Sequence, residues 1–139
     1  MSELLESDVL ILGCGVAGGT VALQLADAGI PVTLVTRATD PHDSNTNLAQ
    51  GGIIYQGQDD TPEQLVEDIL RAGAGHSYSQ AAMILAQEGP RLVEQLLLER
   101  LGVAFDRLPS GALSLALEGG HSLPRIIHAA DATGKAIEE

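Results

Sequence analysis

Residues 8–37 have the sequence D-V-L-I-L-G-C-G-V-A-G-G-T-V-A-L-Q-L-A-D-A-G-I-P-V-T-L-V-T-R, and this stretch decides the fold. Its first apolar run, Val9–Leu12, is typical of a short strand buried on both faces. Apolar residues at helical spacing follow a glycine-rich turn, and Gly29 predicts the end of that helix. A second apolar run, Val32–Val35, predicts a strand parallel to the first. The order of elements predicts a βαβ unit of an α/β fold.

The turn between the first strand and the helix carries the pattern G-x-G-x-x-G at Gly13, Gly15 and Gly18. The first glycine permits a tight turn, the second lets a diphosphate approach the backbone, and the third lets the helix pack against the strand. The helix N-terminus adds unpaired N–H groups and a partial positive charge. Together these features predict a dinucleotide site. Cys14, inside the turn, is interpreted as a small residue rather than as a stabilised thiolate.

The end of the second strand does not identify the dinucleotide. An acidic residue about 20 positions after the glycines usually binds the adenosine ribose. Here the strand runs into Arg37, and the first carboxylate is Asp40. Arg37 suits either a 2′-phosphate or simple solvation, so this unit alone leaves NAD, NADP and FAD open.

Composition narrows the class of protein. The chain has 139 residues, 45% of them hydrophobic and 19% charged, as expected for one globular core. Aromatic residues make up only 2%, and the net charge is −12, which argues against a nucleic-acid partner. The apolar runs are too short to span a membrane, and the acidic start does not resemble a signal peptide. We therefore expect a cytoplasmic protein without a membrane partner, and no metal site is predicted.

The middle of the chain is predicted to be helical scaffold. Thr61-Pro62-Glu63-Gln64 has the pattern of a capping box with proline in the first turn. Ser79 is expected to cap a second helix, and Gly89-Pro90 to interrupt it. A further helix is expected from about Glu88 to Arg100.

The last third is predicted to contain short strands at 103–105 and 112–117, followed by a helix capped by Asp131. Between them, five reactive or charged side chains fall within eleven residues around Gly119-Gly120: Glu118, His121, Ser122, Arg125 and His128. Such a cluster on a loop is a candidate site. Earlier in the chain, Gln50-Gly51-Gly52 suits either a close approach to a planar ligand or an ordinary hinge.

Three segments together resemble the succinate dehydrogenase/fumarate reductase flavoprotein superfamily, and within it the L-aspartate oxidases. They are the G-x-G-x-x-G turn, S-N-T-N-L-A-Q-G-G at residues 44–52, and E-G-G-H-S at 118–122 continued by R-I-I-H-A-A-D-A-T-G at 125–134. The resemblance covers residues 8–139. It implies an α/β, Rossmann-like FAD-binding domain, a parallel sheet with flanking helices that is incomplete at the C-terminus. The remainder of that domain and a capping domain are expected to lie outside these 139 residues, so this stretch alone is not expected to be catalytically active.

The resemblance also implies roles for individual residues. Arg37 matches a basic position in aspartate oxidases, and Asn45 stands where related dehydrogenases carry a histidine bonded to the flavin, so FAD is expected to be non-covalent. Glu118 matches a carboxylate that orients the substrate's amino group. For His121 a structural or flavin-proximal role is favoured over a catalytic one. The implied FAD contacts are Gly13, Cys14, Gly15, Val16, Ala17, Gly18, Arg37, Asn45, Thr46, Asn47, Leu48, Ala49, Gln50, Gly51 and Gly52.

The implied reaction is oxidation of L-aspartate to iminoaspartate, the first step toward quinolinate and NAD, with oxygen or fumarate reoxidising the flavin. A transient complex with quinolinate synthase is also considered, although no residue of the chain indicates it. Three alternatives stay open: a soluble fumarate reductase or succinate dehydrogenase, a pyridine-nucleotide dehydrogenase, and an inactive nucleotide-binding module.

Overall fold

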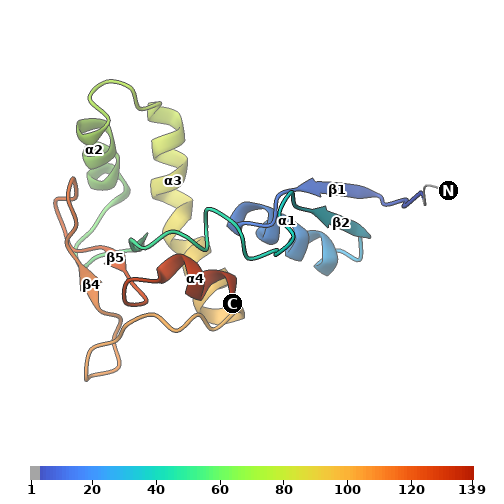
Figure 1. The fold of residues 1–139 in the computed structure, drawn as a ribbon. Coiled ribbons are helices and arrows are strands. Elements are labelled where there is room, and N and C mark those ends of the chain that lie inside the picture. The colour runs from blue at the N-terminus through green and yellow to red at the C-terminus, as the bar shows by residue number, and fades with distance from the viewer. Residues whose placement is uncertain (1–3) are drawn as a thin grey trace.

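The βαβ unit projects from one side of the protein in the computed structural model, which describes residues 4–139 (Figure 1). Strands β1 (Val9–Leu12) and β2 (Val32–Val35) are parallel, with Val9 opposite Val32 and Leu12 opposite Val35. Helix α1 (Val16–Asp27) connects them. This confirms the predicted parallel pair and the crossover helix.

The C-terminus of α1 is also as predicted. Gly29 has a φ of +71°, and the N–H of Ile30 donates to the carbonyl of Leu25 at 3.0 Å. Glycine adopts this left-handed conformation without the steric cost that a Cβ would bring, so it can stop the helix and turn the chain toward β2.

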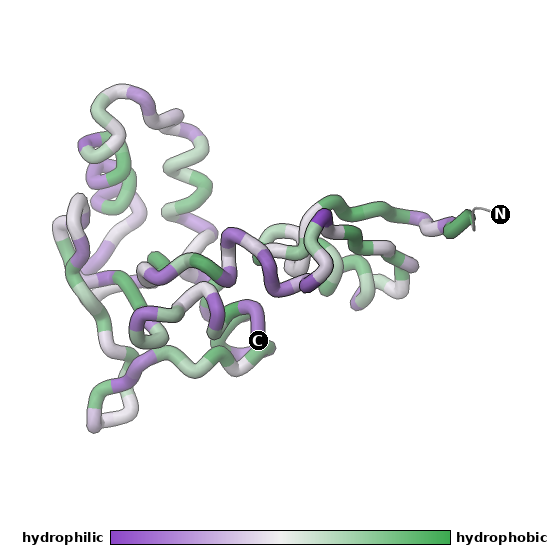
Figure 2. Tube along the Cα trace, viewed as in Figure 1, coloured by the Kyte–Doolittle hydropathy of each residue, from purple (hydrophilic) through white to green (hydrophobic). Residues whose placement is uncertain are grey.

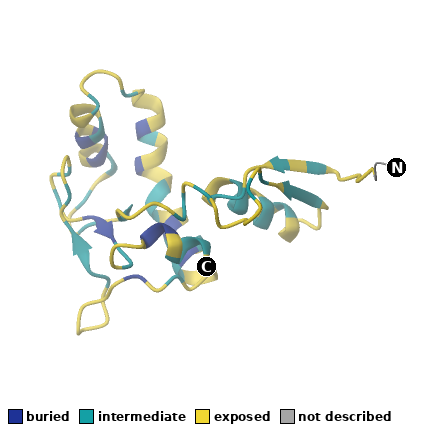
Figure 3. Ribbon diagram, viewed as in Figure 1, coloured by how far each residue is buried: buried dark blue, intermediate teal, exposed yellow. Residues whose placement is uncertain are grey.

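The prediction that β1 is buried on both faces is wrong for the described residues. Leu10 is 60% exposed and Leu12 is 78% exposed. Figure 2 shows β1 as a continuous hydrophobic segment, and Figure 3 shows that no residue of the βαβ unit is coloured as buried. The reason is geometric: β1 pairs with one strand and is covered by one helix, which is too little structure to bury both faces.

Two helices stand side by side in the other half of the molecule (Figure 1), α2 (Pro62–Ala72) and α3 (Ser79–Leu92). The predicted capping box at the start of α2 is confirmed. The Thr61 hydroxyl accepts the N–H of Gln64 at 3.3 Å, and the Gln64 side chain accepts the N–H of Thr61 at 3.1 Å. Ser79 is not a cap, because the residue in the cap position is Tyr78, which makes no side-chain capping bond.

Gly89-Pro90 does not interrupt α3, contrary to the prediction. The helix continues through Pro90 to Leu92 and then changes to the π-helix η1 (Val93–Arg100), so no separate helix begins at Glu88. At its end the N–H of Leu101 donates to the carbonyl of Leu96, five residues earlier. Proline removes one hydrogen bond of the helix and crowds the preceding turn, and here the chain winds more widely after it instead of stopping.

A small antiparallel sheet completes the fold. Its order is β3 (Ile53–Ile54), β5 (Ile126–Ile127), β4 (Leu115–Ala116). The predicted strand at 103–105 is absent from the described structure, and the one at 112–117 shortens to β4. The last helix, α4 (Thr133–Glu138), follows Ala132 in the cap position, so the predicted cap Asp131 is also wrong. Two-residue strands carry no detectable alternation, which explains why β3 and β5 were not predicted.

Among residues 4–139, the buried apolar residues all lie in this second half. One cluster joins α2 to α3, and another joins η1 to the small sheet. Their buried members are Leu65, Val66, Ala82 and Ala86 in the first, and Val93, Leu97, Phe105 and Ile127 in the second. The βαβ unit is tied to this half by the loop of residues 36–52 and by an ion pair between Asp27 and Arg100. Among the described residues, no helix combines the length and apolarity needed to cross a membrane.

Candidate functional site

A pocket of about 740 Å³ opens at the carboxyl ends of β1 and β2. Ligands of open α/β sheets bind outside this edge. Six of the predicted cofactor residues line it: Gly13, Cys14, Gly15, Arg37, Asn45 and Thr46. Thr36, Asp43 and Ser44 line it too and were not predicted, although their positions beside Arg37 and Asn45 could have indicated them.

The glycines of the turn are required by its geometry. Gly13 has a φ of +105°, which L-residues with side chains rarely adopt. A Cβ on Gly18 would lie 2.0 Å from the carbonyl oxygen of Gly13, so the helix could not pack as close to the turn as it does. A Cβ on Gly15 would lie 3.0 Å from the Thr46 hydroxyl oxygen. The turn therefore has the tight, open-backbone form expected of a diphosphate cradle.

The first turn of α1 faces the segment that carries Asn45 and Thr46. No side chain caps the helix at Gly15, and its first turn contains no acidic residue. The N–H of Val16 donates to the Thr46 hydroxyl at 3.0 Å, which fixes that segment against the helix end. The thiol of Cys14 donates to the carbonyl of Pro41 at 2.8 Å, in agreement with its interpretation as a small residue in a turn.

The segment from Ser44 to Gly52 runs from the βαβ unit to the small sheet (Figure 1). Its middle is held by α4, because the N–H of Gly134 donates to the carbonyl of Ala49 at 2.9 Å. Its end is pressed against β5, where a Cβ on Gly52 would lie 2.3 Å from Cγ2 of Ile126. The backbone of the segment is thus fixed at both ends. The predicted contacts between them, Asn47, Leu48, Ala49, Gln50 and Gly51, lie on this fixed stretch, and Leu48, Ala49, Gln50 and Gly51 are exposed.

The cluster predicted around Gly119-Gly120 separates into two groups. The first surrounds Arg125, whose side chain is 0% exposed. Its Nε and Nη2 donate to the Asp60 carboxylate at 2.7 and 2.8 Å, and its Nη1 donates to Asp68 at 2.6 Å. The same Nη1 lies 3.0 Å from Nδ1 of His121, which must accept because guanidinium only donates. Ser122 donates to Asp68 from both its N–H and its hydroxyl, at 2.8 and 2.9 Å.

This first group has the character of a structural network, since its charges face one another in the interior. Burial alone would raise the pKa of the Asp68 carboxyl, but the hydrogen bonds from Ser122 and Arg125 hold that pKa far below its usual range. His121 is joined to the network through Nδ1. Its position therefore depends on Arg125, while its role toward a cofactor stays a prediction.

The second group is a pair. Nε2 of His128 lies 3.0 Å from Oε1 of Glu118, and the two side chains are 23% and 40% exposed. Sequence reasoning placed both in the cluster but assigned a role only to Glu118. The signal it lacked was the register of β4 and β5, which the two-residue strands do not reveal.

Acidification is expected to destabilise the protein through Asp68. Because its pKa is depressed in the folded state, the folded state binds fewer protons than the unfolded state as the pH falls toward about 3.9. The stabilisation is complete above about pH 5 and is lost progressively below it. The melting temperature of the full-length protein should fall between about pH 6 and pH 3.5.

Two variants test the source of that change. Asp68→Asn should have a lower melting temperature than the wild type at about pH 6. Its melting temperature should fall less on acidification, because the titrating carboxyl is gone. In Glu67→Gln, a change at an exposed position of the same helix, acidification should lower the melting temperature as much as it does in the wild type. An unchanged acid response in Asp68→Asn would show that other carboxyls cause it.

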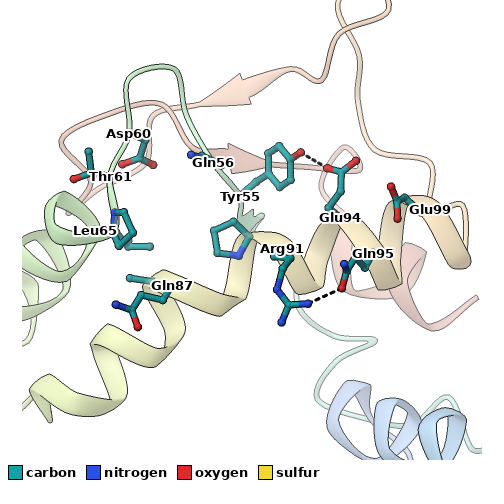
Figure 4. A pocket seen from close by; sticks show the side chains of 13 residues that line it. Tyr55, Gln56, Asp60, Thr61, Leu65, Gln87, Arg91, Glu94, Gln95 and Glu99 are labelled. Carbon is teal, nitrogen blue, oxygen red and sulfur yellow. Dashed lines mark hydrogen bonds between the residues drawn. The ribbon is translucent and has the colours of Figure 1, made fainter.

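A separate pocket of about 480 Å³ lies between α3, η1 and the residues after β3. Figure 4 shows the Tyr55 hydroxyl directed at Glu94 and the Arg91 guanidinium directed at Gln95. Burial, with the hydrogen bond to Glu94, raises the pKa of Tyr55 to about 12, so this hydroxyl stays protonated and donates at neutral pH. None of the predicted cofactor or substrate residues lines this pocket.

Comparison with known proteins identifies the family of this chain. A family model described as an FAD binding domain matches residues 8–139. The chain belongs to the FAD-binding domain family. FAD is therefore the cofactor, as predicted, in place of NAD or NADP, and the α/β fold class is confirmed.

Individual relatives of this FAD-binding domain are also informative. It is 44% identical to the L-aspartate oxidase of Streptomyces coelicolor over 135 residues, 96% of this chain and 23% of the relative. It is 41% identical to the chloroplastic L-aspartate oxidase of Oryza sativa subsp. japonica over 94% of this chain and 20% of the relative. The solved Sdh1 complex of Mycobacterium smegmatis has 31% identity and a TM-score of 0.85, covering 95% of this chain and 22% of that chain.

This FAD-binding domain therefore spans about a quarter or less of the length of these three relatives. Within it, the residues fit the cofactor. The glycine turn leaves room beside the backbone, and the N-terminus of α1 supplies a partial positive charge. Arg37 lines the same pocket and carries a full positive charge. The structure places Val16, Ala17 and Gly18 on the first turn of that helix, next to where the diphosphate would lie.

Proposed function

We propose that this FAD-binding domain supplies the diphosphate site and part of the substrate site of an L-aspartate oxidase. The observation that carries the proposal is the identity of 44% to an L-aspartate oxidase along almost the whole chain, against 31% to the succinate dehydrogenase-type structure. FAD, when bound, accepts the hydride from L-aspartate and passes the electrons to oxygen or fumarate. The domain's own residues bind the cofactor and help orient the substrate.

Glu118 is proposed to orient the substrate through its ammonium group. It follows the short strand β4 at the start of the Gly119-Gly120 turn, and its side chain is partly accessible. A carboxylate paired with an ammonium group distinguishes aspartate from succinate, because the two substrates differ in that group. The proton donor and the residues that grip the two substrate carboxylates are proposed to lie outside these 139 residues, in the remainder of the FAD-binding domain and a capping domain.

FAD is proposed to be bound non-covalently. Asn45 lines the cofactor pocket, and its amide is not a nucleophile that could form a bond to the flavin ring. We further propose that the full-length protein acts in the cytoplasm. A transient complex with quinolinate synthase would let iminoaspartate pass directly to the next enzyme, since imines hydrolyse in water.

The decisive experiment is anaerobic mixing of the full-length protein with L-aspartate, and separately with succinate, while the flavin absorbance is followed. Bleaching by aspartate alone supports the oxidase. Bleaching by succinate alone supports the second candidate, a soluble fumarate reductase or succinate dehydrogenase, which the structural similarity to the Sdh1 complex favours. A protein that takes up no FAD when FAD is supplied would contradict both.

Glu118→Gln is expected to weaken aspartate binding while the flavin is retained. The substitution keeps the shape of the side chain and removes the charge that attracts the ammonium group. Losing one charge-assisted hydrogen bond costs about 1.5–3 kcal/mol, or about 10- to 150-fold in the Kd of aspartate. The Kd follows from the aspartate concentration dependence of flavin bleaching. Glu63→Gln, exposed at the start of α2, is the matched control and should leave that Kd unchanged.

A further inference from the structure

We propose that His128 is a positioning residue that holds the Glu118 carboxylate for the substrate's ammonium group, and thereby favours a dicarboxylate that carries an amino group. The inference rests on the proposed function and assigns to His128 a role in the same substrate site. It starts from the 3.0 Å contact between Nε2 of His128 and Oε1 of Glu118.

The two side chains share one face of the small sheet. Ala116 on β4 is paired with Ile126 on β5, and side chains alternate between faces along a strand. Continuing that alternation by two residues on each strand places Glu118 and His128 on the face shared by Ala116 and Ile126, but beyond opposite ends of that pair, because the strands are antiparallel. Ala116 is small, so the Glu118 side chain can reach across it toward the imidazole.

The imidazole is confined on its other side by the segment that leads from the cofactor pocket. A Cβ on Gly52 would lie 2.8 Å from Cε1 of His128, so the backbone of Gly52 is in close contact with the ring. The carbonyl of His128 accepts the N–H of Asp106 at 2.7 Å, which fixes the main chain. His128 thus lies between Gly52 and Glu118, with little freedom to rotate away from either.

This confinement has a chemical consequence for Glu118. An N–H on Nε2 of His128 occupies one lone pair of Oε1 and leaves Oε2 free to accept from an ammonium group. Without that contact Glu118, which is 40% exposed and adjoins two glycines, would sample several rotamers and lose preorganisation. His121 is held in a different group of side chains, because its Nδ1 is bound to Arg125 in the buried network.

The test uses His128→Asn and His128→Gln in the full-length flavoprotein, with anaerobic flavin bleaching by aspartate and competition by succinate. Asparagine is too short to reach Glu118, so the Kd of aspartate should rise about tenfold. The Kd of succinate, which has no ammonium group, should change less than about twofold. Glutamine keeps a donor near the position of Nε2 and should restore most of the aspartate affinity. His76→Asn, in the exposed loop between α2 and α3, is the control.

A double-mutant cycle with Glu118→Gln separates positioning from a general structural effect. In the Glu118→Gln background, His128→Asn should raise the Kd of aspartate no further. Additive effects, or equal losses for aspartate and succinate, would overturn the inference. These outcomes differ from failure of the proposed function, which would appear as a wild-type protein that aspartate does not bleach. If His128→Asn lost its flavin, the affinities for aspartate and succinate would be compared in His128→Gln instead. Equal losses of affinity for both ligands in that variant would contradict the proposal.

Discussion

Arg125→Met is expected to lower the free energy of unfolding by ~3–5 kcal/mol, because it leaves the buried carboxylate of Asp60 without a counter-ion and Asp68 with only the exposed Arg71 as its partner. Those side chains are 5% and 3% exposed, so water cannot replace the lost hydrogen bonds. Methionine is similar in length and apolar, which separates the loss of charge from the creation of a cavity. The change should appear in the urea unfolding transition of the full-length protein.

Two further substitutions calibrate that result. Arg125→Lys should recover only part of the stability, because an ammonium group cannot bind one carboxylate in bidentate fashion and reach the second at the same time. Arg91→Met removes an exposed arginine that donates to Gln95 and should change the stability by less than ~0.5 kcal/mol. A loss below about 1 kcal/mol for Arg125→Met would mean that the two carboxylates do not depend on Arg125.

Gly18→Ala is expected to weaken FAD binding by about 100-fold, or ~2.7 kcal/mol. The added Cβ would meet the Gly13 carbonyl oxygen at 2.0 Å and Cγ2 of Ile11 at 3.3 Å. The oxygen belongs to the backbone of the turn that is proposed to hold the diphosphate of FAD, so relief of the clash must displace that turn. Flavin content after gel filtration and titration of the apoprotein with FAD measure the effect.

The adjacent glycine provides the control. A Cβ on Gly19 would meet nothing within 4 Å. Gly19→Ala should therefore retain FAD and, because alanine favours helix over glycine, stabilise α1 by up to ~1 kcal/mol. Equal flavin loss in both variants would indicate that helix α1 tolerates no added methyl group, and would contradict the specific role assigned to Gly18.

The features that could be predicted from the sequence are those encoded by neighbouring residues. The βαβ unit follows from two apolar runs and a glycine turn within thirty residues, and the start of α2 follows from a capping box spanning Thr61 and Gln64. The resemblance to a flavoprotein family then predicted FAD as the dinucleotide. Pro90 shows where a prediction from neighbouring residues is wrong. The helix continues through it, and residues on both sides, Ala86 and Val93, are buried in the two core clusters.

By itself, then, the sequence determined the strand–turn–helix that is proposed to bind the diphosphate, since that motif depends on backbone conformations that glycine favours and on short-range periodicity. Tertiary structure decided how the side chains around Gly119-Gly120 divide. The Arg125 side chain lies in the interior because the carboxylates of Asp60 and Asp68 neutralise its charge there. These two residues are 65 and 57 positions away from it in the chain. Glu118 and His128 are in contact because the antiparallel pairing of β4 and β5 puts both on one face of the sheet, where their side chains reach toward each other. Such contacts are set by which distant segments pack together, and no local pattern of residue types records that choice.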